Sequence, residues 1–157
     1  MKQANPIPQG KYVPANRFGD LIFTAGMTPR DNGVLIKTGK IAIDDPIDDY
    51  RDAVRQAAKN ALIAARNKLE EGEHIERIML TTVYVNAQEG YTTQAKIADH
   101  ATDYFCEELG DAGIASRAAV GVASLPGNAP VEVSIIAAAE KASAKHISPV
   151  FGRSRCA

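Results

Sequence analysis

The sequence predicts an α+β fold in which two helices cover one face of a mixed sheet of roughly six strands. Apolar residues recur at intervals of three and four from Asp45 to Gly72 and from Tyr91 to Leu109, which is typical of amphipathic helices. Short β-branched and apolar runs bounded by Gly and Pro lie before, between and after these segments. Two helices are too few to cover both faces of such a sheet, so we expect the other face to self-associate.

The amino-terminal half is expected to contain a strand, a hairpin and the first helix. The β-branched and aromatic run Asp20–Thr24 predicts a strand that ends before a glycine-containing turn. Two glycines around a short apolar run predict a hairpin within Arg30–Gly39. Asp45 can cap the following helix, Pro46 suits its first position, and Gly72 is placed to end it.

The carboxyl-terminal half is expected to supply the centre of the sheet. The segment Ile75–Val85 turns to a period of two in TTVYV, which predicts a central strand. The second helix, Tyr91–Leu109, is closed by Gly110. Two further strands are predicted at Ala118–Ala123 and Val131–Ala138, joined by the turn LPGNAP.

Length and composition fit one globular domain over residues 1–138, followed by an extension or tail over 139–157. The 157 residues are 45% hydrophobic and 24% charged, and the net charge is −1 with no Lys or Arg run, which disfavours a nucleic-acid partner. The chain shows no apolar signal segment and no run of roughly 20 apolar residues. Cys106 and Cys156 lack CxxC spacing and form no obvious pair, so a reduced, cytoplasmic protein without a membrane partner is expected.

Two charged residues interrupt the apolar strands near the end of the predicted domain. Arg117 and Glu132 each lie where a strand expects burial, and an unpaired buried charge costs roughly 2 to 5 kcal/mol. The two side chains either form an ordinary ion pair between strands or bind a substrate. A guanidinium can hold a carboxylate through two parallel N–H bonds, and a glutamate can orient or deprotonate a water molecule.

Two blocks of sequence, IPQGKYVPANRFGDLIFTAGMTP and SRAAVGVASLPGNAPVEVSIIA, lie on either side of the two predicted helices. Over roughly Ile7–Ala138 this pattern resembles the Rid family of reactive intermediate deaminases, which are YjgF-like and whose older members were called L-PSP endoribonucleases. The first block is similar to the amino-terminal portion of that family, and the second is similar to the family signature, in which Arg, a Leu-Pro pair and Glu keep a fixed spacing. The residues at matching positions are Tyr12, Gly26, Arg117, Leu125, Pro126 and Glu132.

This resemblance implies a chorismate-mutase-like subunit that forms a homotrimer with ligand clefts between subunits. It also implies an enzyme that hydrolyses enamines and imines such as 2-aminoacrylate to 2-keto acids and ammonia, without a cofactor or a metal. In that case Arg117 and Glu132 are the catalytic residues, and Arg117, Tyr12 and Gly26 bind a small-molecule carboxylate substrate. Two other functions stay open: a regulatory trimer that binds small carboxylates without turnover, and, with less support, an endoribonuclease.

Some residues depart from the family pattern. Met27 stands where many relatives have glutamine, Asp99 lies near a position often occupied by asparagine, and Ala119 replaces a cysteine that is common in the deaminase branch. These changes are expected to alter the substrate preference. No metal site is expected, because the histidines lie far apart in the sequence: His74, His100 and His146.

Overall fold

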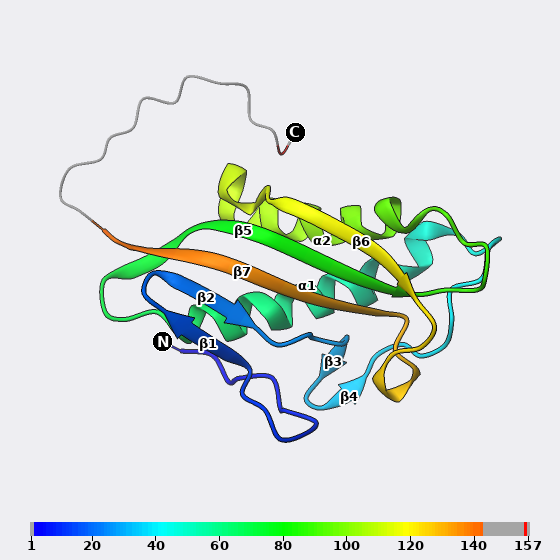
Figure 1. The fold of residues 1–157 in the computed structure, drawn as a ribbon, viewed down its shortest axis with the longest axis horizontal. Helices are drawn as coiled ribbons and strands as arrows, with labels where there is room; N and C mark the ends of the chain where they lie inside the picture. The colour runs from blue at the N-terminus through cyan, green and yellow to red at the C-terminus, as the bar shows by residue number, and fades with distance from the viewer. Residues whose placement is uncertain (1, 143–155, 157) are drawn as a thin grey trace.

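The computed structural model describes residues 2–142 and residue 156. Its main sheet has five strands in the order β1-β2-β7-β5-β6, and β3 and β4 form a separate two-stranded hairpin. Both helices lie on the same face of the main sheet (Figure 1). The predicted α+β architecture is confirmed, with the strands divided between two sheets. The strands are β1 Ala15–Phe18, β2 Leu21–Thr24, β3 Arg30–Asp31, β4 Val34–Leu35, β5 Glu73–Asn86, β6 Ser116–Val122 and β7 Val131–Lys141.

The first helix is shorter than the sequence pattern indicates. A 3₁₀ turn at Ile47–Tyr50 precedes helix α1, Arg51–Arg66. Asp45 does not cap α1, because its carboxylate accepts hydrogen bonds from a backbone N–H of the same loop and from the Tyr50 hydroxyl. The helix ends well before Gly72, whose φ of 78° lies in the turn that enters β5.

The core lies between the two helices and the sheet. Helix α1 faces the sheet with an alanine-rich surface, and small side chains let it approach β7 closely. Helix α2, Gln94–Leu109, packs beside α1 and over β5 and β6. Along β7 every second residue is buried beneath the helices, which is the period-two pattern of a strand covered on one face. These buried residues are Val131, Val133, Ile135, Ala137 and Ala139.

The opposite face of the sheet carries apolar side chains that no described element covers. Leu21 and Phe23 of β2 are each 39% exposed, and Val120 of β6 is 40% exposed. Phe23 is paired in register with the half-buried Ile136 of β7, so both side chains lie on this face. Apolar exposure on a sheet face is typical of surfaces that associate with another subunit.

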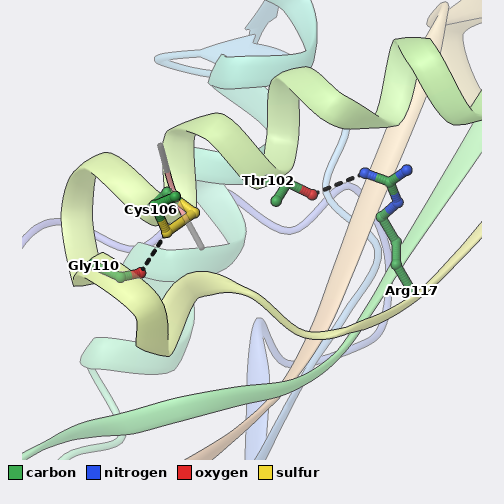
Figure 2. Close-up of a disulfide and its surroundings, with 5 residues drawn as sticks. Thr102, Cys106, Gly110 and Arg117 are labelled. Carbon is green, nitrogen blue, oxygen red and sulfur yellow. Dashed lines mark hydrogen bonds between the residues drawn. A yellow bond between two sulfur atoms is a disulfide. The ribbon is translucent and has the colours of Figure 1, made fainter. Parts of the chain in front are cut away.

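Cys106 of α2 and Cys156 form a disulfide with their Cα atoms 5.6 Å apart (Figure 2). The expectation that Cys106 and Cys156 do not pair is therefore wrong. A separation of 50 residues carries no pairing signal, and only the tertiary structure brings Cys156 to α2.

Strand β7 extends to Lys141, three residues beyond the expected end of the domain at residue 138.

We expect Cys156→Ser to lower the free energy of unfolding by about 2 to 4 kcal/mol, because the disulfide closes a long loop in the unfolded chain. Thermal unfolding with and without reductant measures the effect, and the variant should match the reduced wild type. Alkylation under denaturing, non-reducing conditions followed by mass spectrometry should detect no free thiol. Two alkylated cysteines in the unreduced protein would contradict the pairing.

Candidate active site

Three of the residues singled out from the sequence meet at one cavity of about 380 Å³. Glu132 comes from β7, Gly26 from the segment after β2, and Tyr12 from the chain before β1. Tyr12 is 46% exposed, and its hydroxyl accepts a hydrogen bond from the backbone N–H of Gln9 at 3.0 Å. The cavity is therefore closed on one side by the sheet and on the other by the amino-terminal segment. Its remaining lining residues are Gln9, Ala25, Thr28, Arg30 and Pro126.

Backbone pairing brings Gly26 directly beside Glu132. The next residue, Met27, exchanges two hydrogen bonds with Val133: the Met27 N–H donates at 2.8 Å and the Val133 N–H at 2.9 Å. A Cβ atom on Gly26 would lie 2.5 Å from the Glu132 carboxylate oxygen Oε2. A methyl group at position 26 would therefore displace the Glu132 carboxylate from its present place.

Glu132 carries a carboxylate that no neighbouring side chain neutralises. Within the described residues it makes no ion pair or hydrogen bond, although it is half-buried. Burial raises the pKa of Glu132 above its ordinary value, because the charged form loses solvation. A carboxylate with a raised pKa that faces a cavity is suited to exchange a proton with a ligand or a water molecule.

Arg117 is held by helix α2 and does not line this cavity. Its Nη1 donates to the Asp99 carboxylate and to the Thr102 hydroxyl, each at 2.9 Å, and its Nη2 donates to the Ala95 carbonyl at 3.1 Å. Figure 2 shows the guanidinium directed from β6 toward Thr102 of the helix. The side chain is 22% exposed, so part of the guanidinium remains accessible at the edge of the sheet.

Arg117 and Glu132 lie on opposite faces of the sheet. Thr81 of β5 is paired in register with Arg117 of β6 and with Ile135 of β7, so the three side chains lie on the same face of the sheet. That face is the one covered by the helices, since Thr81 and Ile135 are buried. Glu132 is three residues from Ile135, and strand alternation directs it to the other face. Within one subunit the structure therefore does not bring the two residues together, and the ion pair between strands is not formed.

Arg30 is a cavity residue that the sequence did not single out. It lies in β3, and its Nη1 donates to the Gly33 carbonyl at 2.8 Å. Its Nε is buried and has no hydrogen-bond partner among the residues that the structure describes. An arginine in an expected hairpin is usually solvated, so nothing in the local pattern marked it. Its guanidinium lies against the turn before β7, since a Cβ on Gly127 would lie 3.0 Å from Arg30 Nη2, and Pro126 of that turn lines the same cavity.

A separate group of possible metal ligands lies at the other end of the long strands. His74, Glu76 and Glu140 are exposed, and their ligand atoms lie within 4.8 Å of one another. Sequence spacing missed this group, because His74 and Glu140 meet only through the register of β5 and β7. Exposed acidic groups of this kind are common without an ion, and His146 lies outside the described residues.

The structure locates all three residues that depart from the family pattern. Asp99 is the carboxylate that holds Arg117, and Met27 pairs with β7 and is only 6% exposed. Ala119 is half-buried on β6, on the same face as Arg117, and does not line the cavity. In the described part of the chain, no helix combines the length and hydrophobicity that crossing a membrane requires.

The comparisons with known proteins agree with this architecture. The family model described as Endoribonuclease L-PSP matches residues 2–139. Protein TCP17 of Trypanosoma cruzi is 28% identical over 127 residues, which cover 80% of this chain and 79% of TCP17. The crystal structure of Atu1372 from Agrobacterium tumefaciens, a protein of unknown function, is 29% identical with a TM-score of 0.75, over 88% of this chain and 87% of Atu1372. TdcF of E. coli, crystallised with bound serine, is 25% identical with a TM-score of 0.61, over 85% of this chain and 92% of TdcF. The resemblance seen in the two sequence blocks is confirmed, and the chain belongs to the L-PSP endoribonuclease family, the Rid-like proteins.

Proposed function

We propose that this protein is an imine and enamine deaminase that hydrolyses 2-imino acids to 2-keto acids and ammonia. The observation that carries the proposal is the unpaired, half-buried carboxylate of Glu132 beside Gly26 in the cavity. An imine already reacts slowly with water, so a positioned carboxylate and an oriented substrate are sufficient for acceleration. The bound serine of the relative TdcF supports a small carboxylic acid as the ligand.

The site is completed by a second subunit in this proposal. Arg117 lies on β6, which is an edge of the sheet, and the uncovered apolar face supplies a surface for association. In a homotrimer with clefts between subunits, Arg117 of a neighbouring subunit reaches the cavity that contains Glu132. Its guanidinium then binds the substrate carboxylate through two parallel N–H bonds, and Tyr12 closes the cleft.

The proposed reaction requires one proton carrier. Glu132 removes a proton from water as the water oxygen forms a bond to the imine carbon, and the nitrogen takes up a proton from solvent. The resulting carbinolamine collapses when its hydroxyl proton is released and the C–N bond breaks. Ammonia leaves with a proton returned from Glu132, and the carbon retains the oxygen as a ketone. No metal or cofactor is part of the proposal.

The direct test is ammonia release from freshly generated 2-iminopropanoate, measured beside light scattering for subunit number. We expect hydrolysis well above the rate in buffer and a mass of three subunits. A trimer that binds pyruvate without accelerating hydrolysis would instead favour the regulatory alternative. Cleavage of a labelled RNA would favour the endoribonuclease alternative, which the balanced charge disfavours.

The cytoplasmic location belongs to the same proposal and has its own test. A disulfide between Cys106 and Cys156 is more typical of oxidising compartments than of a reducing cytoplasm. Cell fractionation with thiol trapping should recover the protein in the cytoplasmic fraction. Recovery outside the cytoplasm, with both cysteines oxidised, would contradict the location without affecting the proposed reaction.

Gly26→Ala is expected to lower kcat/KM for 2-iminopropanoate by about 100-fold, because the added methyl group displaces the Glu132 carboxylate and small misplacements carry penalties of that size. Steady-state kinetics measures the loss. Gly10→Ala is the matched control, since a Cβ at Gly10 meets only the ring of Tyr12 at an ordinary 3.5 Å. Equal kinetics for the Gly26 variant and wild type would show that the carboxylate position is unimportant.

A further inference from the structure

We propose that this site accepts 2-imino acids with a second carboxylate group and that Arg30 binds that group. The inference deepens the proposed function and rests on it. In the proposed function, Arg117 of a neighbouring subunit binds the carboxylate next to the imine. The guanidinium of Arg30, which lines the cavity itself, is then available for a different anionic group. The chemical class is a dicarboxylic 2-imino acid.

Arg30 stands where two cavities adjoin. The cavity that contains Glu132 has about 380 Å³, and a second cavity of about 250 Å³ lies against it. A ligand whose imine carbon is near Glu132 can therefore extend past Arg30 into the second cavity. The residues that line both cavities are Gln9, Tyr12, Gly26, Thr28 and Arg30.

The guanidinium of Arg30 has unused hydrogen-bonding capacity. Its Nη1 donates to the Gly33 carbonyl, while its Nε is buried and without a partner. Within the described residues no carboxylate forms an ion pair with it. Nε has no surface accessible from the cavity, but Nη2 donates no hydrogen bond within the described residues, so an anionic ligand would supply Nη2 with an acceptor and the guanidinium with the opposite charge.

Helix α1 fixes the backbone of the Arg30 segment before a ligand arrives. The Arg30 carbonyl accepts hydrogen bonds from Asn60 Nδ2 at 2.8 Å and from Gln56 Nε2 at 3.1 Å. Asn60 is 6% exposed and also donates to the Thr28 carbonyl at 3.2 Å. A buried amide that holds two carbonyls of one segment is a means of preorganising the guanidinium.

The second cavity suits a polar group better than an apolar one. Gln56, Lys59 and Asn60 of α1 line it together with Arg30. Lys59 and Asp31 are both exposed and carry opposite charges, so the partly buried guanidinium of Arg30 gives the cavity its positive charge. The amides of Gln56 and Asn60 are bound to the Arg30 segment. These residues favour a carboxylate over an alkyl side chain.

The test compares 2-iminoglutarate with 2-iminopropanoate. For Arg30→Met, the ratio of kcat/KM for the dicarboxylic over the monocarboxylic imine should fall about 10- to 100-fold, the size of a lost charge-assisted hydrogen bond. Arg30→Lys should recover part of that ratio, because it keeps the charge without the planar fork. Arg51→Ala removes an exposed arginine from the start of α1 and should leave the ratio unchanged.

Binding of the product 2-oxoglutarate, measured by calorimetry, gives a readout that does not need turnover. We expect the same 10- to 100-fold weakening in Arg30→Met. An unchanged ratio or unchanged 2-oxoglutarate binding would overturn the inference, as would an equal loss for both imines. If the wild type hydrolyses neither imine, and Arg30→Met binds 2-oxoglutarate more weakly than the wild type does, the proposed enzyme fails but the second anion site stands. If Arg30→Met does not fold, the same kcat/KM ratio is measured for Arg30→Lys. A ratio below that of the wild type supports the inference, and a ratio equal to that of the wild type overturns it.

Discussion

Glu132→Gln is expected to lower kcat/KM for 2-iminopropanoate by about 100-fold or more, the usual contribution of a positioned general base. Glutamine has nearly the same shape as glutamate but cannot take a proton from water. The substitution therefore keeps the packing against Gly26 and removes only the acid–base chemistry. Ammonia release at saturating and subsaturating substrate separates kcat from KM, and the loss should appear in kcat.

The pH profile identifies the group responsible. Burial raises the pKa of Glu132 above its ordinary value of 4.5, and only the ionised form can accept a proton. Activity should therefore fall as the pH decreases through this raised pKa, at a higher pH than an exposed glutamate would give. The residual activity of Glu132→Gln should not show this decrease at low pH. The same decrease of activity at low pH in the variant would show that another residue titrates.

Stability provides the control for the same substitution. A pKa that is higher in the folded protein than in the unfolded chain means that ionised Glu132 opposes folding above the unfolded pKa. Removing the charge should leave the melting temperature at neutral pH unchanged or slightly higher. A marked decrease in melting temperature together with lost activity would indicate a structural role for Glu132 in place of a catalytic one.

Local sequence patterns predicted most helices and strands, because the residue spacing that is typical of each element lies within a short stretch of the chain. The helical spacing around α2 and the period-two runs of β5 and β7 identify those elements directly. The end of α1 was less well predicted, because apolar spacing continues into the loop after Arg66. Strand β1 was missed, since ANRF is a weak β run that depends on its pairing with β2.

The candidate site was only partly predictable, because its members meet through tertiary contacts. Glu132 and Gly26 were identified from the sequence blocks, and the structure brings them together through the pairing of Met27 with Val133. Arg30 reaches the cavity through the separate hairpin, which no local pattern connects to β7. Arg117 illustrates a different limit, because one subunit leaves it on the opposite face of the sheet from Glu132.

Arg117→Ala is expected to lower kcat/KM for 2-iminopropanoate by about 1,000-fold, because two charge-assisted hydrogen bonds to the substrate carboxylate are lost together. Light scattering should show an unchanged oligomer. The structure gives Arg117 a competing role, since it ties β6 to α2 through Asp99, Thr102 and the Ala95 carbonyl. A loss of activity alone therefore does not distinguish substrate binding from packing.

Asp99→Ala separates these two roles. It removes the ion pair with Arg117 but keeps the guanidinium, and Asp99 is largely exposed, so the loss of stability should be only about 0.2 to 1 kcal/mol. If Arg117 binds substrate, Asp99→Ala should keep activity within about tenfold of wild type while Arg117→Ala loses nearly all of it. Equal losses of activity and melting temperature in both variants would mean that the guanidinium serves the packing of α2. The carboxylate clamp would then have to be sought at Arg30, whose side chain lines the cavity that contains Glu132.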